Sequence, residues 1–207
     1  MDEVINNPSD FISNRKLAPE NLHIVDIEEE LVDSQEFYNI TQSFVSDNHC
    51  ETFLLRFRYA YADRSNGLLK VQPDGQVCVN GEVCDKNTWF KVIHSFEDSS
   101  YRIICIEGEN QNKVLYMDRN YLKTREYIHG HDDYSKETQF DFVRKANNSW
   151  EISARTTGHI LKFDKETGMY LPQPTNDQVD CPALFCDPDI GPKFKVYIPK
   201  WIKVTTV

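Results

Sequence analysis

The chain has 207 residues, of which 40% are hydrophobic and 12% aromatic, enough for a packed core in one large all-β domain or two small ones. The net charge of −10 is concentrated at the N-terminus, where residues 1–50 hold eleven acidic and only two basic side chains. An acidic arm joined to a nearly neutral body argues against nucleic acid as the main partner.

Residues 1–50 show no sustained hydrophobic period, and their prolines and the acidic run at 26–30 are typical of a solvated segment. We therefore expect residues 1–50 to form an acidic, mostly disordered and flexible arm, with at most one short helix near residues 26–37. The folded domain is expected over residues 51–207. Within the arm, Asp33 precedes the small Ser34 and is a candidate processing site for a caspase-type protease, although it is also one acid among eleven.

The chain shows no signal peptide and no stretch of about 18–20 apolar residues, the length of a membrane span. We expect a cytoplasmic protein, or one that is secreted without a signal peptide. The six cysteines have no zinc-binding spacing. A two-residue turn at Asn80-Gly81 would offset Cys78 from Cys84 by one position, which disfavours a disulfide and predicts mostly free thiols.

From Glu51 onward, short strands rich in β-branched and aromatic residues alternate with turn residues. Pro73-Asp74-Gly75 and Asn80-Gly81 are turn signals, and the segment 165–168 again ends in glycine at a bend. The expected strands are Phe53–Tyr61, Leu68–Gln72, Gln76–Val79, Trp89–Phe96, Arg102–Glu107, Val114–Met117, Tyr121–Thr124, Gln139–Arg144, Trp150–Ala154, Ile160–Phe163, Met169–Leu171, Ala183–Cys186 and Phe194–Ile198.

Three hairpin-like segments repeat along the chain, with Leu68, Leu115 and Leu161 spaced by 47 and 46 residues. Each is followed by an aromatic strand, at 89–92, then at 140–143, and last at either 183–185 or 194–196. A threefold period of this length predicts a twelve-stranded, threefold pseudo-symmetric β-trefoil, in which hairpins cap a closed barrel. The three leucines are expected to be equivalent and buried.

The segment Gly67–Val77, with Pro-Asp-Gly between two strands, resembles the first capping hairpin of fibroblast growth factors. The segments 102–108 and 114–117 resemble the next strand pair of that family, and the likeness covers about residues 53–186. The resemblance implies a trefoil ligand of a protein receptor. The acidic arm and the missing leader look more like the interleukin-1 branch, whose members carry an N-terminal prosegment.

The chain also departs from related trefoil families. Heparin-binding growth factors cluster basic residues in the third repeat, whereas Gly168–Phe185 contains no Lys or Arg, so heparin binding is not expected. The Gln-x-Trp pattern of sugar-binding trefoils is absent at all three tryptophans.

No group of residues predicts catalysis, a metal or a cofactor. His129-Gly130-His131-Asp132-Asp133 offers two imidazoles and carboxylates, but no third remote ligand is indicated, so a polar loop is expected. Cysteines and serines occur without a motif that links them to a base.

The C-terminal segment alternates basic and apolar residues, which predicts a closing strand with solvated lysines. Two functional alternatives are that the lysines contact a binding partner or an acidic surface, or that the segment pairs with the protein's own acidic arm. The candidate partner-binding residues are Lys193, Lys195, Lys200, Trp201 and Lys203. Asn39 and Asn147 head glycosylation sequons that matter only if the chain is secreted.

The sequence thus predicts a non-enzymatic, growth-factor- or cytokine-like signalling trefoil that binds a protein receptor or partner. The alternatives are an intracellular adaptor that joins a protein complex and, with less support, a protease inhibitor of the Kunitz trefoil type.

Overall fold

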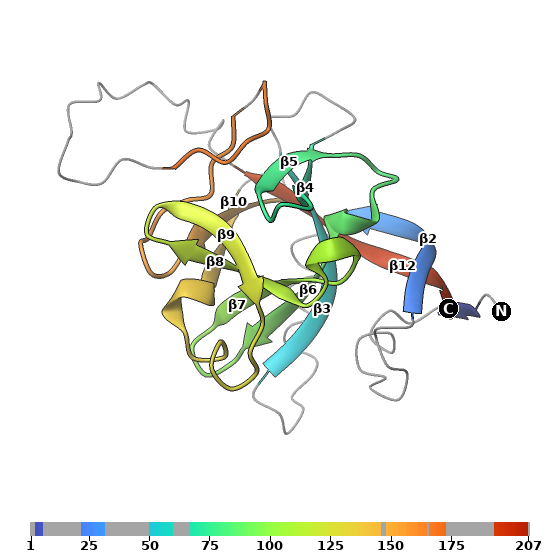
Figure 1. The fold of residues 1–207 in the computed structure, drawn as a ribbon, viewed down its shortest axis with the longest axis horizontal. Helices are drawn as coiled ribbons and strands as arrows, with labels where there is room; N and C mark the ends of the chain where they lie inside the picture. The colour runs from blue at the N-terminus through green and yellow to red at the C-terminus, as the bar shows by residue number, and fades with distance from the viewer. Residues whose placement is uncertain are drawn as a thin grey trace.

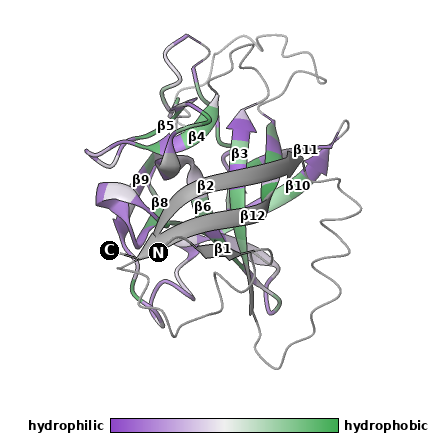
Figure 2. Cartoon of the chain, turned by 90° about the vertical axis from the view of Figure 1, so that its right-hand side faces the viewer, coloured by the Kyte–Doolittle hydropathy of each residue, from purple (hydrophilic) through white to green (hydrophobic). Residues whose placement is uncertain are grey.

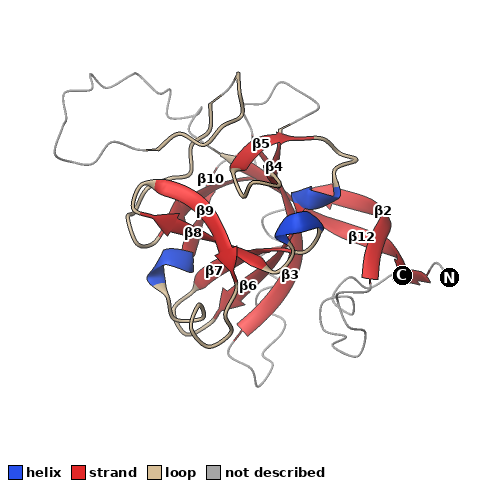
Figure 3. Cartoon of the chain, in the orientation of Figure 1, coloured by secondary structure: helices blue, strands red, loops and turns tan. Residues whose placement is uncertain are grey.

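The computed structural model describes residues 3–5, 22–31, 50–59, 67–145, 148–164, 166–172 and 193–206, with the backbone alone for 3–5, 22–31, 50–52, 86 and 199–206. The regular secondary structure of this part of the chain is strand, apart from short 3₁₀ turns, and loops join the strands (Figure 3). The strands are β1 Glu3–Ile5, β2 Leu22–Leu31, β3 Cys50–Tyr59, β4 Leu68–Val71, β5 Val77–Gly81, β6 Trp89–Ser95, β7 Ser100–Cys105, β8 Lys113–Asp118, β9 Tyr121–Glu126, β10 Phe140–Lys145, β11 Ser149–Ala154 and β12 Phe194–Thr206. The 3₁₀ turns are η2 Lys86–Thr88, η3 Gly108–Asn110 and η4 Lys136–Thr138.

Six strands close into a barrel. The pairing runs β3–β6–β7–β10–β11–β12, and β12 pairs back with β3, so that every neighbouring pair is antiparallel (Figure 1). Closure leaves none of these strands as an edge within the barrel.

The registers of the barrel repeat three times. Phe90, Phe140 and Phe194 each begin or nearly begin a barrel strand, and all three side chains are fully buried. Each phenylalanine lies between two neighbouring strands and pairs with one residue of each. The partners hold corresponding positions in the three repeats. The pairs are Leu55–Phe90–Cys105, Tyr101–Phe140–Ala154 and Trp150–Phe194–Tyr59. The chain is therefore a β-trefoil, and its last aromatic strand is the one at 194–196.

Three hairpins lie off the barrel. β4 and β5 form the first, β8 and β9 the second, and residues 160–171 the third, where Phe163 pairs with Tyr170. The chain enters them through the equivalent pairs Arg58–Leu68, Ile104–Val114 and Ser153–Ile160.

These entry pairs correct one predicted equivalence. Leu68, Val114 and Ile160 are spaced by 46 residues each, so the residue equivalent to Leu115 and Leu161 is Leu69 and not Leu68. All four leucines are fully buried, as expected, but Leu69, Leu115 and Leu161 share the central cluster. Two adjacent leucines satisfy the hydrophobic pattern equally well, and only the strand register separates them.

The expected turn at Asn80-Gly81 is wrong. Both residues lie at the end of β5, where Gly81 pairs with Leu68. A Cβ atom on Gly81 would lie 2.6 Å from Thr88 Cγ2 and 2.9 Å from the Leu68 carbonyl oxygen. Glycine is required there for a close backbone approach and not for a turn. The Pro73-Asp74-Gly75 turn is confirmed, because the Gly75 amide donates to the Gln72 carbonyl at 2.8 Å.

Two strands lie within the segment that the sequence assigns to a disordered arm. β2 replaces the start of the short helix expected near 26–37, and both β1 and β2 pair with β12 (Figure 1). The physical reason is that β12 continues beyond the barrel, so its backbone groups there need partners from elsewhere in the chain. The rest of residues 1–49 lies outside the described residues, and a boundary at residue 50 remains a prediction.

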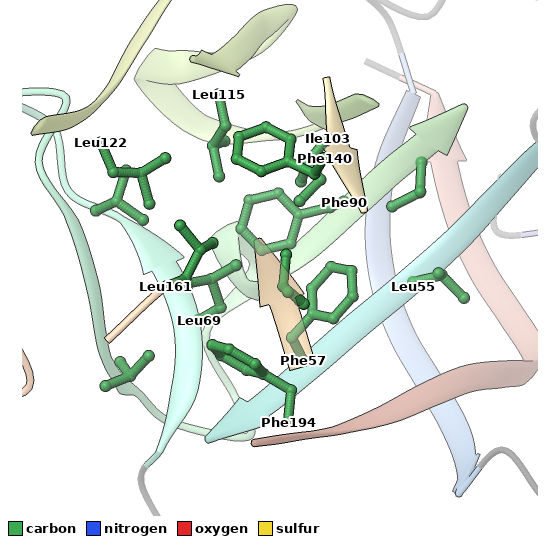
Figure 4. Packing of buried hydrophobic residues seen from close by; sticks show 14 of the residues in the cluster. Leu55, Phe57, Leu69, Phe90, Ile103, Leu115, Leu122, Phe140, Leu161 and Phe194 are labelled. Atoms are coloured by element: carbon green, nitrogen blue, oxygen red, sulfur yellow. The ribbon is translucent and has the colours of Figure 1, made fainter. Parts of the chain in front are cut away.

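The core fills the barrel and the space between the hairpins. Phe57, Phe90, Phe140 and Phe194 meet the hairpin leucines in this cluster (Figure 4). Figure 2 shows hydrophobic stretches in the barrel strands, such as β3, and hydrophilic residues in many of the connecting loops. The barrel interior is therefore packed with side chains.

A stack of three rings crosses β6, β7 and β10. The ring centroids of His94 and Tyr101 lie 4.5 Å apart at 16°, and those of Tyr101 and Phe142 lie 4.3 Å apart at 13°. Burial lowers the pKa of His94 below its ordinary value of 6.5, and Asp98 offsets this only in part. The folded protein therefore holds this imidazole neutral.

This stack predicts a pH dependence. Below pH 6.5 the unfolded state binds the His94 proton before the folded state does, so the contribution of the neutral ring is lost as pH falls from 6.5 toward the lowered folded pKa. His94→Phe should flatten the fall in Tm between about pH 7.5 and about pH 5, because it removes the titrating ring and keeps an aromatic one. An unchanged pH profile in His94→Phe would contradict this account.

Within the described residues, Cys78 and Cys105 are buried free thiols and Cys84 is an exposed one. Burial raises the pKa of Cys105 to about 12, so this thiol is unreactive. None of the helices in the described part of the chain has the length and apolarity needed to cross a membrane.

Candidate functional site

The three hairpins meet around a groove with a volume of about 470 Å³. The turn between β4 and β5 contributes one wall, β9 a second and the third hairpin the last. The lining residues are Asp74, Gly75, Gln76, Val77, Lys113, Tyr121, Leu122, Lys123, Thr124, Met169, Tyr170 and Pro172. Because segments far apart in sequence build it, this groove is a product of the trefoil and of no single motif.

Contacts between the hairpins hold the walls together. The Val79 amide donates to the Gly168 carbonyl at 2.8 Å, and Cys78 pairs with Met169 in an isolated bridge. The Tyr170 hydroxyl lies 4.0 Å from Met117 Sδ in the second hairpin. The groove thus rests on a fixed frame, which favours a preformed binding surface.

The turn that forms the first wall depends on glycine. Gly75 has φ +86°, and a Cβ atom there would lie 3.0 Å from Thr124 Oγ1 on β9. The Gln76 amide donates to Asp74 Oδ1 at 3.0 Å, which closes the turn with a side-chain acceptor. Both the backbone conformation and the approach of β9 therefore select glycine.

Gly130 provides a matched control for this claim, because it has the same φ of +86° but no atom within 4 Å of the place that a Cβ atom would take. Gly130→Ala should cost about 1 kcal/mol from the left-handed backbone alone, and Gly75→Ala about 2 kcal/mol because the turn must also move away from β9. Chemical denaturation of both variants measures the difference. Equal costs would show that the contact with Thr124 carries no energy.

Two of the three charged residues that line the groove, Lys113 and Lys123, are basic. Lys113 donates to Asn110 Oδ1 at 2.9 Å, and the half-exposed Lys123 pairs with Asp118 at 2.5 Å. The hydrogen bond from Lys123 holds the pKa of Asp118 below its ordinary value. Among the described residues that line the groove, Asp74 is the only acidic one. The exposed pair of Lys123 with Asp118 contributes little to stability, so Lys123 remains available to a ligand.

The apolar lining comes from aromatic and aliphatic side chains. Tyr121 is 56% exposed, and Leu171, next to the lining residues Tyr170 and Pro172, is 44% exposed. Burial raises the pKa of Tyr170 to about 12, so its phenol stays neutral. Exposed apolar groups beside cations suit a ligand that carries both an apolar group and a negative charge.

The sequence does not predict this site. Tyr121, Lys123 and Tyr170 come from two different hairpins, and each has an ordinary strand context in the sequence. The one available signal is the placement of Tyr121 directly after the turn Asp118-Arg119-Asn120, where a large aromatic residue is not needed for the turn.

The predicted closing strand at the C-terminus is confirmed. Phe194 and Val196 are buried in the barrel, whereas Lys193 and Lys195 are half-buried. Lys200, Trp201 and Lys203 lie in the part of β12 that pairs with β2, which is the pairing with the acidic arm that the sequence left open. None of these five residues lines the groove, and a role for them in partner binding stays a prediction.

The loop at 129–133 has a structural role. Asp132 is buried, accepts from Arg125 Nη2 at 2.8 Å and from the Ile128 amide at 2.7 Å, and lies next to His131 Nδ1 at 3.2 Å. Asp133 accepts from the Tyr127 hydroxyl at 2.5 Å and from the Gly130 amide at 2.9 Å. The carboxylates are therefore already engaged, and no cluster of three or more metal-binding side chains occurs among the described residues.

The structure does not test three of the predicted site residues. Asp33, Asn39 and Asn147 lie outside the described residues, as does the strand expected at Ala183–Cys186. Their roles remain predictions.

Comparison with known proteins gives a fold and no family. No protein-family model matches the chain, and no curated protein matches it. Among solved structures, a designed 3-fold symmetric protein, ThreeFoil, matches with a TM-score of 0.49 and 13% identity over 69% of this chain and 96% of that one. A mosquitocidal holotoxin matches with a TM-score of 0.52 and 9% identity over 70% of this chain.

The match spans only 17% of the holotoxin chain, and the identity is too low to carry function. Because no family model and no curated protein matches, the resemblance to growth factors and cytokines rests on the sequence segments at 67–77, 102–108 and 114–117 alone. The closed barrel, the threefold registers and the three hairpins together identify the chain as a β-trefoil protein.

Proposed function

We propose that this trefoil is a non-enzymatic protein that binds a protein partner through the groove between its hairpins. The observation that carries the proposal is the exposed Tyr121 and Leu171 beside a preformed groove that Lys113 and Lys123 also line. Tyrosine at the centre of a rigid patch is a common anchor of protein interfaces.

The proposed ligand is a partner segment with an aromatic or aliphatic side chain next to an acidic residue. The apolar side chain would lie against Tyr121, Tyr170 and Met169, and the acidic group would lie near the two lysines. Charge complementarity of this kind gives specificity and speeds association. A growth-factor- or cytokine-like ligand and an intracellular adaptor would both use such a surface.

Affinity capture with the full chain tests the proposal. Wild-type protein, the groove variant Tyr121→Ala with Leu171→Ser, and the control Tyr134→Ala, which alters an exposed tyrosine outside the groove, are compared on native cell extract and on culture medium. A partner of the groove is captured by the wild type and the control and lost from the groove variant. The cellular location of the captured partner, at the cell surface or inside the cell, separates the secreted ligand from the adaptor.

The captured protein is then titrated in purified form. We expect the groove variant to bind at least about tenfold more weakly than the control, and Lys123→Glu to weaken binding further at low salt. Equal affinity of the groove variant and the control would overturn the proposal.

A further inference from the structure

The last part of β12 extends beyond the barrel. Its pairs with the barrel strands β3 and β11 involve only residues 194–197. Residues 198–206 pair, within the described part of the chain, with β2 and, over Ile202–Val204, with β1. We call this projecting segment, residues 198–206, the β12 extension.

The β12 extension is irregular at Pro199. The register shifts between Pro199 and Trp201, which leaves one extra residue in β12. Proline has no amide hydrogen to donate, and a bulge is one of the few places where a strand tolerates it. A second register shift lies between Lys203 and Val204, so the pairing of the extension with β2 is interrupted twice.

β2 reaches the extension from far away in the sequence. The 18 residues of segment 32–49 separate its end from β3, and in the described structure β2 pairs with β12 alone. The barrel closes without it, because all six barrel pairings involve other strands. β2 is thus an added strand held by one neighbour, and such strands have low local stability.

The two strands are complementary in charge. Residues 22–31 hold four acidic residues and no Lys or Arg, whereas the β12 extension holds two lysines, Lys200 and Lys203, and no acidic residue. Asp26 lies directly opposite Lys203 in the register, with Ile27 opposite Ile202 beside it. The other three acidic residues, Glu28, Glu29 and Glu30, lie opposite Trp201, Pro199 and Ile198. The register thus places one acidic residue against a lysine, and the rest of the match is one of overall charge.

We propose that the β12 extension is a strand-addition site for an acidic, extended segment of a partner protein, and that β2 occupies this site until the partner displaces it. The partner's backbone would replace the hydrogen bonds of β2, and one of its acidic residues would lie opposite Lys203, as Asp26 of β2 does. Affinity from main-chain hydrogen bonds and specificity from alternate side chains are the usual basis of strand addition. This site is independent of the groove between the hairpins.

A peptide of residues 20–33, labelled with a fluorophore, is the probe. In the full-length wild-type chain the tethered β2 competes at an effective concentration on the order of 1 mM, so the peptide should bind weakly. Ile27→Pro removes a strand donor and breaks β2, and this variant should bind the peptide at least about tenfold more tightly than wild type. Ile27→Val keeps a β-branched residue and should bind no better than wild type.

Two further measurements keep the test decisive. If Ile27→Pro does not fold, Glu28→Lys with Glu30→Lys weakens β2 through charge alone and should also raise peptide binding. A peptide with its acidic residues changed to Asn or Gln should bind less tightly, and binding of the acidic peptide should weaken as salt shortens the Debye length from about 10 Å to about 3 Å.

Three results would overturn the proposal. One is equal peptide binding by wild type and both opened variants, and another is binding that ignores salt and peptide charge. The third is a concentration-dependent wild-type dimer that Ile27→Pro abolishes, since this would show that β2 exchanges between two copies of the chain rather than yielding to a different partner.

Discussion

Phe140→Ala is expected to lower the free energy of unfolding by about 3–5 kcal/mol, the usual cost of emptying a buried phenylalanine site. Phe140 is fully buried and pairs with Tyr101 on one side and with Ala154 on the other. For a chain of this size the change corresponds to a fall in Tm of roughly 6–20 °C. Val143→Ala on the same strand is the control, because Val143 is 44% exposed and should cost less than about 1 kcal/mol.

The threefold registers extend this prediction to two further phenylalanines. Phe90 and Phe194 hold equivalent positions with the same burial, so alanine at each should cost as much as alanine at Phe140 within about 1–2 kcal/mol. Urea denaturation of the three variants measures this. A variant as stable as Val143→Ala would show that its phenylalanine does not belong to the ring of equivalent core residues.

Asp132→Ala is expected to cost about 3 kcal/mol, because it removes one partner of a largely buried ion pair. The Asp132 side chain is only 1% exposed, and without it Arg125 loses a hydrogen bond and the Ile128 amide loses its acceptor. Glu137→Ala is the matched control, since Glu137 binds the same Arg125 at 3.0 Å but is half-exposed, and it should cost less than about 1 kcal/mol.

The same substitution predicts a pH effect with a defined sign. Burial by itself would raise the pKa of Asp132, but hydrogen bonds from the Ile128 amide, His131 and Arg125 outweigh burial and hold the pKa below its ordinary 3.8. The contribution of this carboxylate is therefore present above pH 3.8 and lost as pH falls through the lowered folded pKa. The stability gap between wild type and Asp132→Ala should shrink in acid, and a constant gap would contradict the role of the ionised carboxylate.

The sequence by itself determined the all-β class, the threefold period, most strand positions and the Pro73-Asp74-Gly75 turn. These features follow from local physics. Alternation with a period of two marks a strand, and proline followed by glycine sets the backbone of a turn wherever it occurs. The repeat of hairpin and aromatic strand then carried the trefoil architecture, because three similar units must bury similar faces.

Only the tertiary structure decided the strand registers. It assigned the equivalent leucine to Leu69, placed Gly81 inside a strand against Leu68 and Thr88, and selected the strand at 194–196 to close the barrel. In each case the local pattern allowed two answers, and pairing with a strand distant in sequence selected one of them.

The sequence could not predict the two candidate sites, because both depend on contacts between segments that are distant in sequence. The groove joins side chains from three hairpins, and the strand at 22–31 forms because the basic β12 extension offers it unpaired backbone groups and complementary charge. An acidic segment read alone has the composition of a disordered chain, since it cannot bury much apolar surface by itself. Whether such a segment is ordered depends on the strand that it meets, and that strand lies more than 150 residues away in the sequence.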